Sequence, residues 1–439
     1  EGYTSEGAGI ARLNGCAVFV PGAVRGDDCD IRVVNVRSRY AWGKIERLYT
    51  PSPHRVVPDC RVFPDCGGCA LRHLTYEEEL RLKKDHAMET MRRIGGSEPI
   101  FDGIIGAREV DAYRNKAQYP VRYQKGRVVA GFYRNGTHEV VPCGDCRIES
   151  AASRAIRNAV LAYMRRFHVH AYNELDGSGL IRHIFVRTSR NGTSSLVCIV
   201  ATKKELPFSR ELVDMLRRAC EGVTGILINV NRRRDNVILS DETVLLWGSE
   251  FITETLLGYR FRLSVDSFFQ VNPASANNIF EYVKNYISEN FENPLVLDAY
   301  AGITAFGICL SDIAAKVVSV EEVKASVDLA SKIIKENGIK NVELHNMDAG
   351  KFFEKELNTK GRSFDVTVLD PPRKGCSEES LDYALKLTKG KIIYVSCNPA
   401  TLARDLKYLT EHGAKVEFIQ PFDMFPHTYH VEDVAVISV

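Results

Sequence analysis

Apolar runs that alternate with longer amphipathic stretches fill the last third of the chain. The runs recur after about residue 262 at residues 295–299, 317–320, 342–344, 366–369 and 392–395. Strand-like runs separated by helical stretches predict a parallel, doubly wound α/β sheet. Two more runs, residues 416–419 and 434–438, are joined by a loop instead of a helix. We therefore expect the last strand to run antiparallel to its neighbours.

The first part of the chain has a different pattern. Short alternating runs with glycine turns up to about residue 50 predict a small antiparallel barrel, and prolines at 51, 53 and 58 suggest a linker. Residues 76–94 predict a charged helix that ends at Gly95-Gly96. Between about 110 and 250, strand-like runs mix with two helices. We expect a multidomain chain, divided into an OB-like barrel (1–52), an α+β middle domain (53–262) and a Rossmann-like domain (263–439).

Composition narrows the class of protein. The chain has 439 residues, 45% of them hydrophobic and 26% charged, which is typical of a folded globular protein. The sequence has no apolar run of the roughly 20 residues that a membrane helix needs, and residues 1–9 are too polar for a signal peptide. We expect a cytoplasmic protein that acts as a monomer. Basic residues gather at 37–47, 154–166 and 232–234, either as a solvated face or as phosphate contacts.

Residues with useful chemistry follow the predicted strands. Ligands of open α/β sheets bind outside the carboxyl ends of the strands. The residues at those ends are Asp298, Tyr300, Glu321, Asp348, Asp370 and Cys397. The turn at Gly302 lacks the second glycine of a pyrophosphate-binding loop, and Glu321 follows it at nearly the spacing of a ribose-binding acid. This favours a nucleoside cofactor without phosphates, although Glu321 and Asp348 can also be helix caps.

Cys397 is a candidate nucleophile. It follows a predicted strand and precedes Asn398-Pro399, where a helix should begin. The partial positive charge of a helix N-terminus stabilises a thiolate. A buried structural cysteine is the alternative.

The neighbouring motifs suggest what such a thiolate does. Residues 370–373 read DPPR, a rigid turn similar to the loop of amine methyltransferases, but with arginine where they place a stacking aromatic residue. A carbon target is more plausible. Methylation at C5 of uracil would account for the remaining residues. C5 attacks a methylsulfonium only after a thiolate has added at C6, and a base must then remove the C5 proton. Glu432 is a candidate base, with His427 and His430 as rivals.

Taken together, these motifs resemble the RNA uridine-5-methyltransferase family. Residues 396–405 read SCNPATLARD, residues 370–375 read DPPRKG and residues 425–432 read FPHTYHVE. The resemblance implies S-adenosylmethionine as cofactor, Cys397 as nucleophile and Glu432 as base. It also implies a stacking role near the target base for Phe268 and a cofactor pocket lined by Gln270, Tyr300, Glu321, Asp348 and Asp370. Thr304 stands where the family usually has glycine, which can narrow this pocket.

The first 150 residues extend the resemblance. The barrel resembles a TRAM domain, an RNA-binding module. The chain has twelve cysteines, and clustered cysteines in such a protein indicate a metal or catalysis. By resemblance, Cys60, Cys66, Cys69 and Cys146 are the ligands of a [4Fe-4S] cluster, with Cys143 as a competitor for the fourth position. Four thiolates suit structural zinc equally well.

The RNA itself is not named by these motifs. The barrel and the cysteines together resemble the enzymes of 23S ribosomal RNA more than those of transfer RNA, which remain the alternative. Two other functions stay open: an amine methyltransferase, because of the DPP turn, and a non-catalytic RNA-binding or ribosome maturation factor, because of the barrel and the basic runs. Neither gives Cys397 and Glu432 a task.

Overall fold

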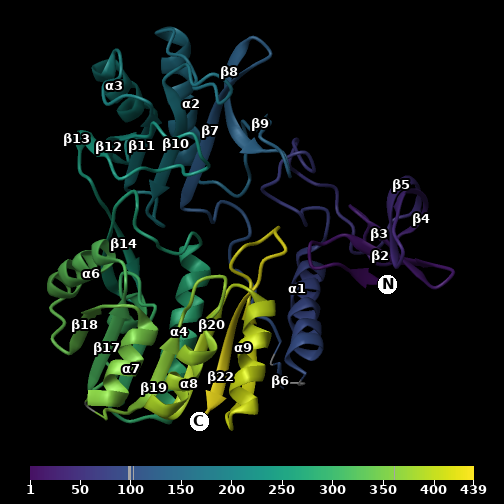
Figure 1. The fold of residues 1–439 in the computed structure, drawn as a ribbon. Coiled ribbons are helices and arrows are strands. Elements are labelled where there is room, and N and C mark those ends of the chain that lie inside the picture. Colours follow the sequence, from purple (N-terminus) through teal and green to yellow (C-terminus); the bar gives the residue numbers. More distant parts are fainter. Residues whose placement is uncertain (97–99, 102, 360) are drawn as a thin grey trace.

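The computed structural model describes residues 1–96, 100–101, 103–359 and 361–439. The described residues form three β-sheets and one separate two-stranded hairpin. Figure 1 shows the three sheets in three separate parts of the molecule. No helix within the described residues has the length and apolar character needed to cross a membrane.

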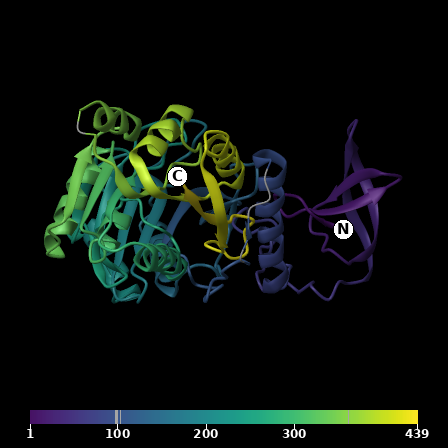
Figure 2. The ribbon, with the colours of Figure 1, turned by 90° about the horizontal axis from the view of Figure 1, so that it is seen from below.

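The N-terminal sheet has the strand order β1-β2-β3-β5-β4. Its strands are β1 (Gly2–Tyr3), β2 (Gly9–Leu13), β3 (Cys16–Val20), β4 (Asp28–Val36) and β5 (Tyr40–Thr50). The prediction of an antiparallel barrel was wrong for one pair, because β3 and β5 run parallel. After β3 the chain crosses to the far edge, forms β4 there and returns as β5 in the direction of β3. Figures 1 and 2 show this sheet at one side of the molecule, beyond helix α1.

The middle sheet has the order β13-β12-β11-β10-β7-β8-β9. Its elements in chain order are β7 (Lys116–Gln124), β8 (Arg127–Tyr133), β9 (Val140–Pro142), α2 (Ala151–Arg166), β10 (Ile181–Thr188), β11 (Ser195–Ala201), α3 (Ser209–Ala219), β12 (Val223–Val230) and β13 (Thr243–Gly248). The buried faces of α2, α3 and the sheet form one apolar core. The four strands and two helices predicted here are confirmed. A separate hairpin, β14 (Ile252–Leu256) and β15 (Tyr259–Leu263), follows.

The C-terminal sheet has eight strands in the order β18-β17-β16-β19-β20-β22-β21-β6. The strands are β16 (Leu295–Ala299), β17 (Lys316–Glu321), β18 (Val342–Asn346), β19 (Phe364–Leu369), β20 (Thr388–Ser396), β21 (Lys415–Phe422), β22 (Glu432–Ser438) and β6 (Ile100–Phe101). The first five run parallel. As predicted, β22 is antiparallel, and it lies between β20 and β21.

Helices cover both faces of this sheet, and two apolar cores lie between them and the strands. They are α4 (Pro273–Asn290), α5 (Ala305–Cys309), α6 (Lys324–Glu336), α7 (Ala349–Thr359), α8 (Glu378–Leu387) and α9 (Pro399–Glu411). Helix α1 (Tyr76–Thr90) continues into a π-helical turn, η1 (Met91–Gly95), which packs against α9. The buried side chain of Met91 belongs to a core of the C-terminal sheet. The helix predicted before the Gly95-Gly96 pair therefore binds the first part of the chain to the last.

Candidate active site

A cavity of about 530 Å³ opens at the carboxyl ends of the parallel strands. The loops after β16, β17, β18, β19 and β20 line it, together with the segment before α4 and the loop before β22. Every residue that the sequence predicted for the catalytic, cofactor and base positions lines this cavity: Phe268, Gln270, Tyr300, Glu321, Asp348, Asp370, Cys397 and Glu432.

The antiparallel last strand brings Cys397 and Glu432 together. Ser396 of β20 pairs with Asp433 of β22. One step further along an antiparallel ladder, Cys397 therefore lies opposite Glu432. Directly opposite residues have Cβ atoms about 4.5–5.5 Å apart. A parallel strand in this position would have placed Glu432 at the other edge of the sheet.

The charges around Cys397 oppose one another. Burial raises the pKa of its thiol, and the nearby Glu432 and Asp370 carboxyl groups raise it further. The guanidinium of Arg373 contacts the thiol and lowers its pKa. Helix α9 begins two residues later, with Pro399 in its first turn and the Asn398 side chain accepting a hydrogen bond from the Ala400 N–H at 3.1 Å. Arg373 and the helix N-terminus thus provide the positive charge that a thiolate needs.

Three buried carboxyl groups line the cavity. Burial raises the pKa of Asp298 to about 7 and that of Asp370 to about 7. Burial, with Asp370 and Asp433 nearby, holds the pKa of Glu432 well above its usual range, and its Oε2 lacks a hydrogen-bond partner among the described residues. Burial favours the neutral forms of these carboxyl groups, although Arg373 partly opposes this effect at Glu432. A ligand that brings a positive charge, such as a methylsulfonium, would favour their ionised forms.

Around the Gly302 turn, backbone N–H groups fix the carboxylates that face the cavity. Glu321 accepts hydrogen bonds from Gly302 at 2.9 Å and from Val323 at 2.8 Å, which fixes its carboxylate beside the glycine turn. Asp348 lines the cavity and also accepts from the Lys351 N–H at 3.0 Å at the start of α7. One oxygen of Asp348 therefore caps helix α7, as the alternative interpretation expected, and the same residue also lines the cavity.

Thr304 lies beside the cavity in an unusual backbone conformation. Its φ is +62°, in the left-handed region that favours glycine. The side chain is 1% exposed, and its hydroxyl has no hydrogen-bond partner among the described residues. Its neighbours Ile303 and Ala305 line the cavity, while its Cγ2 lies toward Gly307 of α5. Threonine in place of the family's glycine therefore strains the backbone at this position, and its side chain does not fill the cavity.

The rivals of Glu432 occupy different places. His430 lines the cavity, and burial lowers the pKa of its imidazole, so the ring is neutral at physiological pH. His427 is packed between Glu79 and Asp111, with its Nδ1 3.4 Å from Glu79 Oε2. At the mouth of the cavity, Phe268 is 68% exposed, which leaves its ring free to stack on a base.

Sequence patterns predicted no role for several residues that line the cavity, among them Arg373 and Phe425. Arg373 was noted only as a side chain unlike an aromatic, although it contacts the Cys397 thiol. Phe425 was quoted within a motif without a role. The signal for Arg373 was available, because a cation beside a catalytic cysteine is a common means of stabilising a thiolate.

The clustered cysteines come from separated segments. Cys66 interacts electrostatically with Cys60 and Cys146, and Cys69 with Cys66 and Cys146. Cys143 and Cys146 are buried in one apolar group, with Cys69 packed against it. Within the described ranges, however, no three His, Cys, Asp or Glu side chains are arranged to hold a metal ion. The expected iron–sulfur site is therefore not confirmed.

Comparisons with known proteins agree with this geometry. The TRAM domain family matches residues 1–45, and the tRNA (uracil-5-)-methyltransferase family matches residues 205–438. An uncharacterized RNA methyltransferase of Clostridium tetani is 36% identical over all of this chain and 95% of its own length. A second, from Bacillus cereus, is 36% identical over 99% of this chain and 95% of its own.

A solved structure is similar over nearly its whole length. The tRNA (uracil-54, C5)-methyltransferase of Pyrococcus abyssi, in complex with S-adenosyl-L-homocysteine, has a TM-score of 0.79 and 26% identity, and the match covers 99% of this chain and 98% of that one. The expectation of a non-catalytic RNA-binding factor is not supported by these relatives. The chain belongs to the tRNA (uracil-5-)-methyltransferase family and is an S-adenosylmethionine-dependent RNA (uracil-5-)-methyltransferase.

Proposed function

We propose that this protein methylates C5 of a uridine in RNA through a covalent bond between Cys397 and C6 of the uracil ring. One observation carries the proposal: the register of β20 and β22 sets Cys397 opposite Glu432 within the same cavity. A nucleophile and a base on adjacent strands can serve two neighbouring carbon atoms of one ring.

The proposed reaction needs neither an oxidant nor a reductant. The Cys397 thiolate adds to C6, and the electrons of the C5–C6 double bond move toward the C4 carbonyl to give an enolate. C5 then attacks the methyl carbon of S-adenosylmethionine, whose carbon–sulfur bond breaks to leave S-adenosylhomocysteine. Glu432 removes the C5 proton. The electrons of that C–H bond restore the C5–C6 double bond and expel the thiolate.

The remaining cavity residues have binding roles in this proposal. Tyr300, Glu321 and Asp348, at the carboxyl ends of β16, β17 and β18, would hold the nucleoside of S-adenosylmethionine, and Gln270 and Asp370 would hold the rest of that molecule. Phe268 stacks on the target base, which must leave its helix or loop to enter a cavity. The buried carboxyl groups support a cationic cofactor, since the sulfonium offsets their charge.

The substrate is proposed as ribosomal RNA, with transfer RNA as the alternative. The TRAM domain and the cysteine set favour 23S ribosomal RNA by resemblance, whereas the similar Pyrococcus abyssi protein is named for uridine 54 of transfer RNA. Both readings use the same site and the same chemistry.

We further propose that Cys60, Cys66, Cys69 and Cys146 hold a [4Fe-4S] cluster. Their mutual interactions and the apolar group around Cys146 support a thiolate donor set partly shielded from water. When bound, the cluster would brace the segments around it. Protein purified without oxygen should contain about four iron and four sulfide per chain, and Cys146→Ser should lower both. Zinc without sulfide would contradict the cluster.

Methyl transfer from labelled S-adenosylmethionine tests the main proposal. Total RNA from a strain that lacks the gene is the substrate, and wild type is compared with Cys397→Ala. We expect 5-methyluridine in either the ribosomal or the transfer RNA fraction, only with the intact cysteine. Methylation by the variant, or a product other than 5-methyluridine, would contradict the mechanism. The labelled fraction decides between the two RNA classes.

A further inference from the structure

The loop between β21 and β22, residues 423–431, forms one wall of the cavity. Phe425 and His430 of this loop line the cavity, and the next strand begins with Glu432. On its other side Glu432 pairs with Phe422, the residue that directly precedes Asp423. The position of Glu432 therefore depends on how residues 423–427 are held.

A buried lysine from a distant part of the sequence contacts this loop. Lys83 lies in α1, and its side chain is fully buried. Its Nζ donates to Glu79 Oε1 at 2.7 Å, to Asp423 Oδ1 at 2.7 Å and to the Phe425 carbonyl at 3.1 Å. An ammonium group has three N–H donors, so these contacts use all of them.

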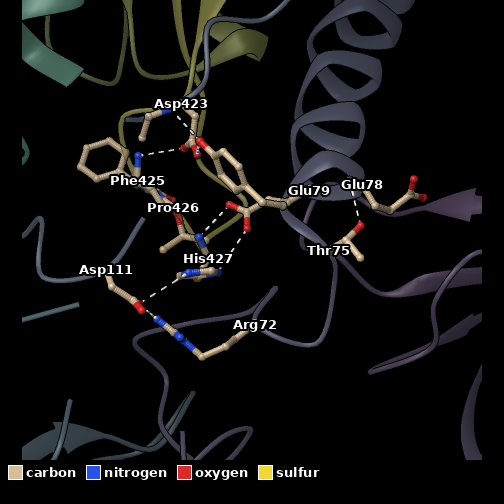
Figure 3. Close-up of polar contacts among 12 residues, drawn as sticks. Arg72, Thr75, Glu78, Glu79, Asp111, Asp423, Phe425, Pro426 and His427 are labelled. Carbon is tan, nitrogen blue, oxygen red and sulfur yellow. Dashed lines mark hydrogen bonds and ion pairs between the residues drawn. The ribbon is translucent and has the colours of Figure 1, made fainter. Parts of the chain in front are cut away.

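The two carboxylates carry the contact on to the loop backbone. Glu79 Oε1 accepts from the His427 N–H at 2.7 Å, and Asp423 Oδ1 accepts from the Phe425 N–H at 3.1 Å. Asp423 Oδ2 accepts from the Tyr76 hydroxyl at 2.8 Å. Figure 3 shows Glu79 of α1 directed toward His427, and Asp423 beside Phe425. The exposed fractions of the Glu79 and Asp423 side chains are close to zero.

We propose that Lys83 and Glu79 are positioning residues for proton removal by Glu432. Lys83 joins the two carboxylates into one buried unit, and this unit holds the backbone of residues 423–427 against α1. This inference rests on the proposed function, because it assumes that Glu432 removes the C5 proton. It adds that a helix some 340 residues earlier in the chain sets the place of that base.

Other contacts keep the loop folded when this unit is weakened. The Tyr113 hydroxyl donates to the Pro426 carbonyl at 3.1 Å, and the Ala70 and Leu71 N–H groups donate to the His427 carbonyl at 2.8 and 3.0 Å. Loss of Lys83 should therefore displace the loop rather than unfold it. A displacement of about 1 Å at a catalytic group can lower a rate about 100-fold, and the step that needs Glu432 should suffer most.

Lys83→Met is the direct test, and Glu79→Gln is the milder one. Lys83→Met leaves two carboxylates buried without a cation and can fail to fold, whereas Glu79→Gln keeps the size of the side chain and an acceptor oxygen. Arg362→Met is the matched control, because Arg362 pairs with the buried carboxylate of Glu356 at 2.6 Å in another part of the molecule. Each variant is given RNA and labelled S-adenosylmethionine. Single-turnover methylation, steady-state turnover and the amount of denaturation-resistant protein–RNA adduct are measured.

We expect both Lys83→Met and Glu79→Gln to keep single-turnover methylation within about three-fold of wild type and to accumulate methylated adduct. Turnover should fall about 10- to 100-fold for Lys83→Met and less for Glu79→Gln. If Lys83→Met does not fold, Glu79→Gln alone decides. The proposal is overturned if methylation and turnover fall together without adduct, or if the variants behave like Arg362→Met. Failure of Glu432→Gln to accumulate adduct would instead overturn the proposed role of Glu432.

Discussion

Cys397 and Glu432 lie opposite each other across two antiparallel strands, one residue beyond the Ser396–Asp433 pair. The direction of the last strand, β22, therefore determines which residue faces Cys397. Because this strand enters at the edge where the parallel strands end, its first residue reaches the cavity that the strand ends line. Facing positions at the ends of these two strands therefore bring a thiol and a carboxyl group into the same cavity.

Glu432→Gln should separate methyl transfer from product release. The amide cannot accept the C5 proton, so the methylated ring should remain bonded to Cys397 and turnover should fall at least about 100-fold. Denaturing gels with labelled RNA would show the accumulated adduct. Asp433→Asn is the control. It removes a carboxyl group that raises the pKa of Glu432, but successive side chains of a strand point to opposite faces, so Glu432 stays in place and no adduct should accumulate. Normal turnover by Glu432→Gln would assign the proton to another base.

Arg373→Met should make the Cys397 thiol less acidic. The guanidinium lowers the pKa of the thiol, against the effects of burial and of two carboxyl groups. Its removal should raise the midpoint of iodoacetamide alkylation at Cys397, as followed by mass spectrometry of the peptide. Arg373→Lys keeps a positive charge and should shift the midpoint less. An unchanged midpoint in Arg373→Met would show that helix α9 alone stabilises the thiolate.

Local patterns predicted much of the fold because each element of the C-terminal sheet has a strong periodic signal. Every predicted strand there was confirmed, and β16 matches its prediction at both ends. The parallel pairing of β3 with β5 was missed, because strand order depends on where the chain crosses the sheet, which residues 21–27 do not reveal. Strand β6 was also missed, since two residues have no detectable period.

The residues of the site also differ in whether local sequence patterns could predict them. Residues at strand ends, such as Asp370 and Cys397, were predictable because the edge of a parallel sheet gathers them. Lys83 was not, since a lysine in a charged helix normally lies in water. Only the packing of α1 against the loop at Asp423 shows why this lysine is buried.

The ligand-free protein should lose stability as the pH rises from about 4 to 7. Asp298 and Asp370 have pKa values of about 7 when folded, above the value of about 4 in an unfolded chain. The folded state thus binds these protons more tightly, and its stability falls as the pH passes from the unfolded value through the folded one. Melting temperatures at several pH values measure this. Asp370→Asn should have a shallower slope, and an equal slope would exclude Asp370 as a source.

The charge of the cofactor should act in the opposite direction. S-adenosylmethionine carries a sulfonium that S-adenosylhomocysteine lacks, and a cation favours ionised carboxyl groups. The increase in melting temperature with S-adenosylmethionine, relative to that with S-adenosylhomocysteine, should therefore grow between pH 6 and 8. In Asp370→Asn this difference should depend less on pH. A difference that stays constant in the wild type would mean that the carboxyl groups do not sense the sulfonium.

Thr304→Gly should stabilise the protein without changing its affinity for the cofactor. A β-branched residue at a φ of +62° is strained, and such strain costs about 1–3 kcal/mol. Glycine has more conformational freedom in the unfolded chain, which reduces the net gain in the free energy of unfolding. A net gain of about 1 kcal/mol would raise the melting temperature of a chain of this length by about 1 °C. Thr304→Ala is the control, because it removes the unpartnered hydroxyl but keeps the strained backbone. An equal gain from alanine would locate the cost in the buried hydroxyl, and tighter binding of S-adenosylhomocysteine by Thr304→Gly would show that the threonine narrows the pocket after all.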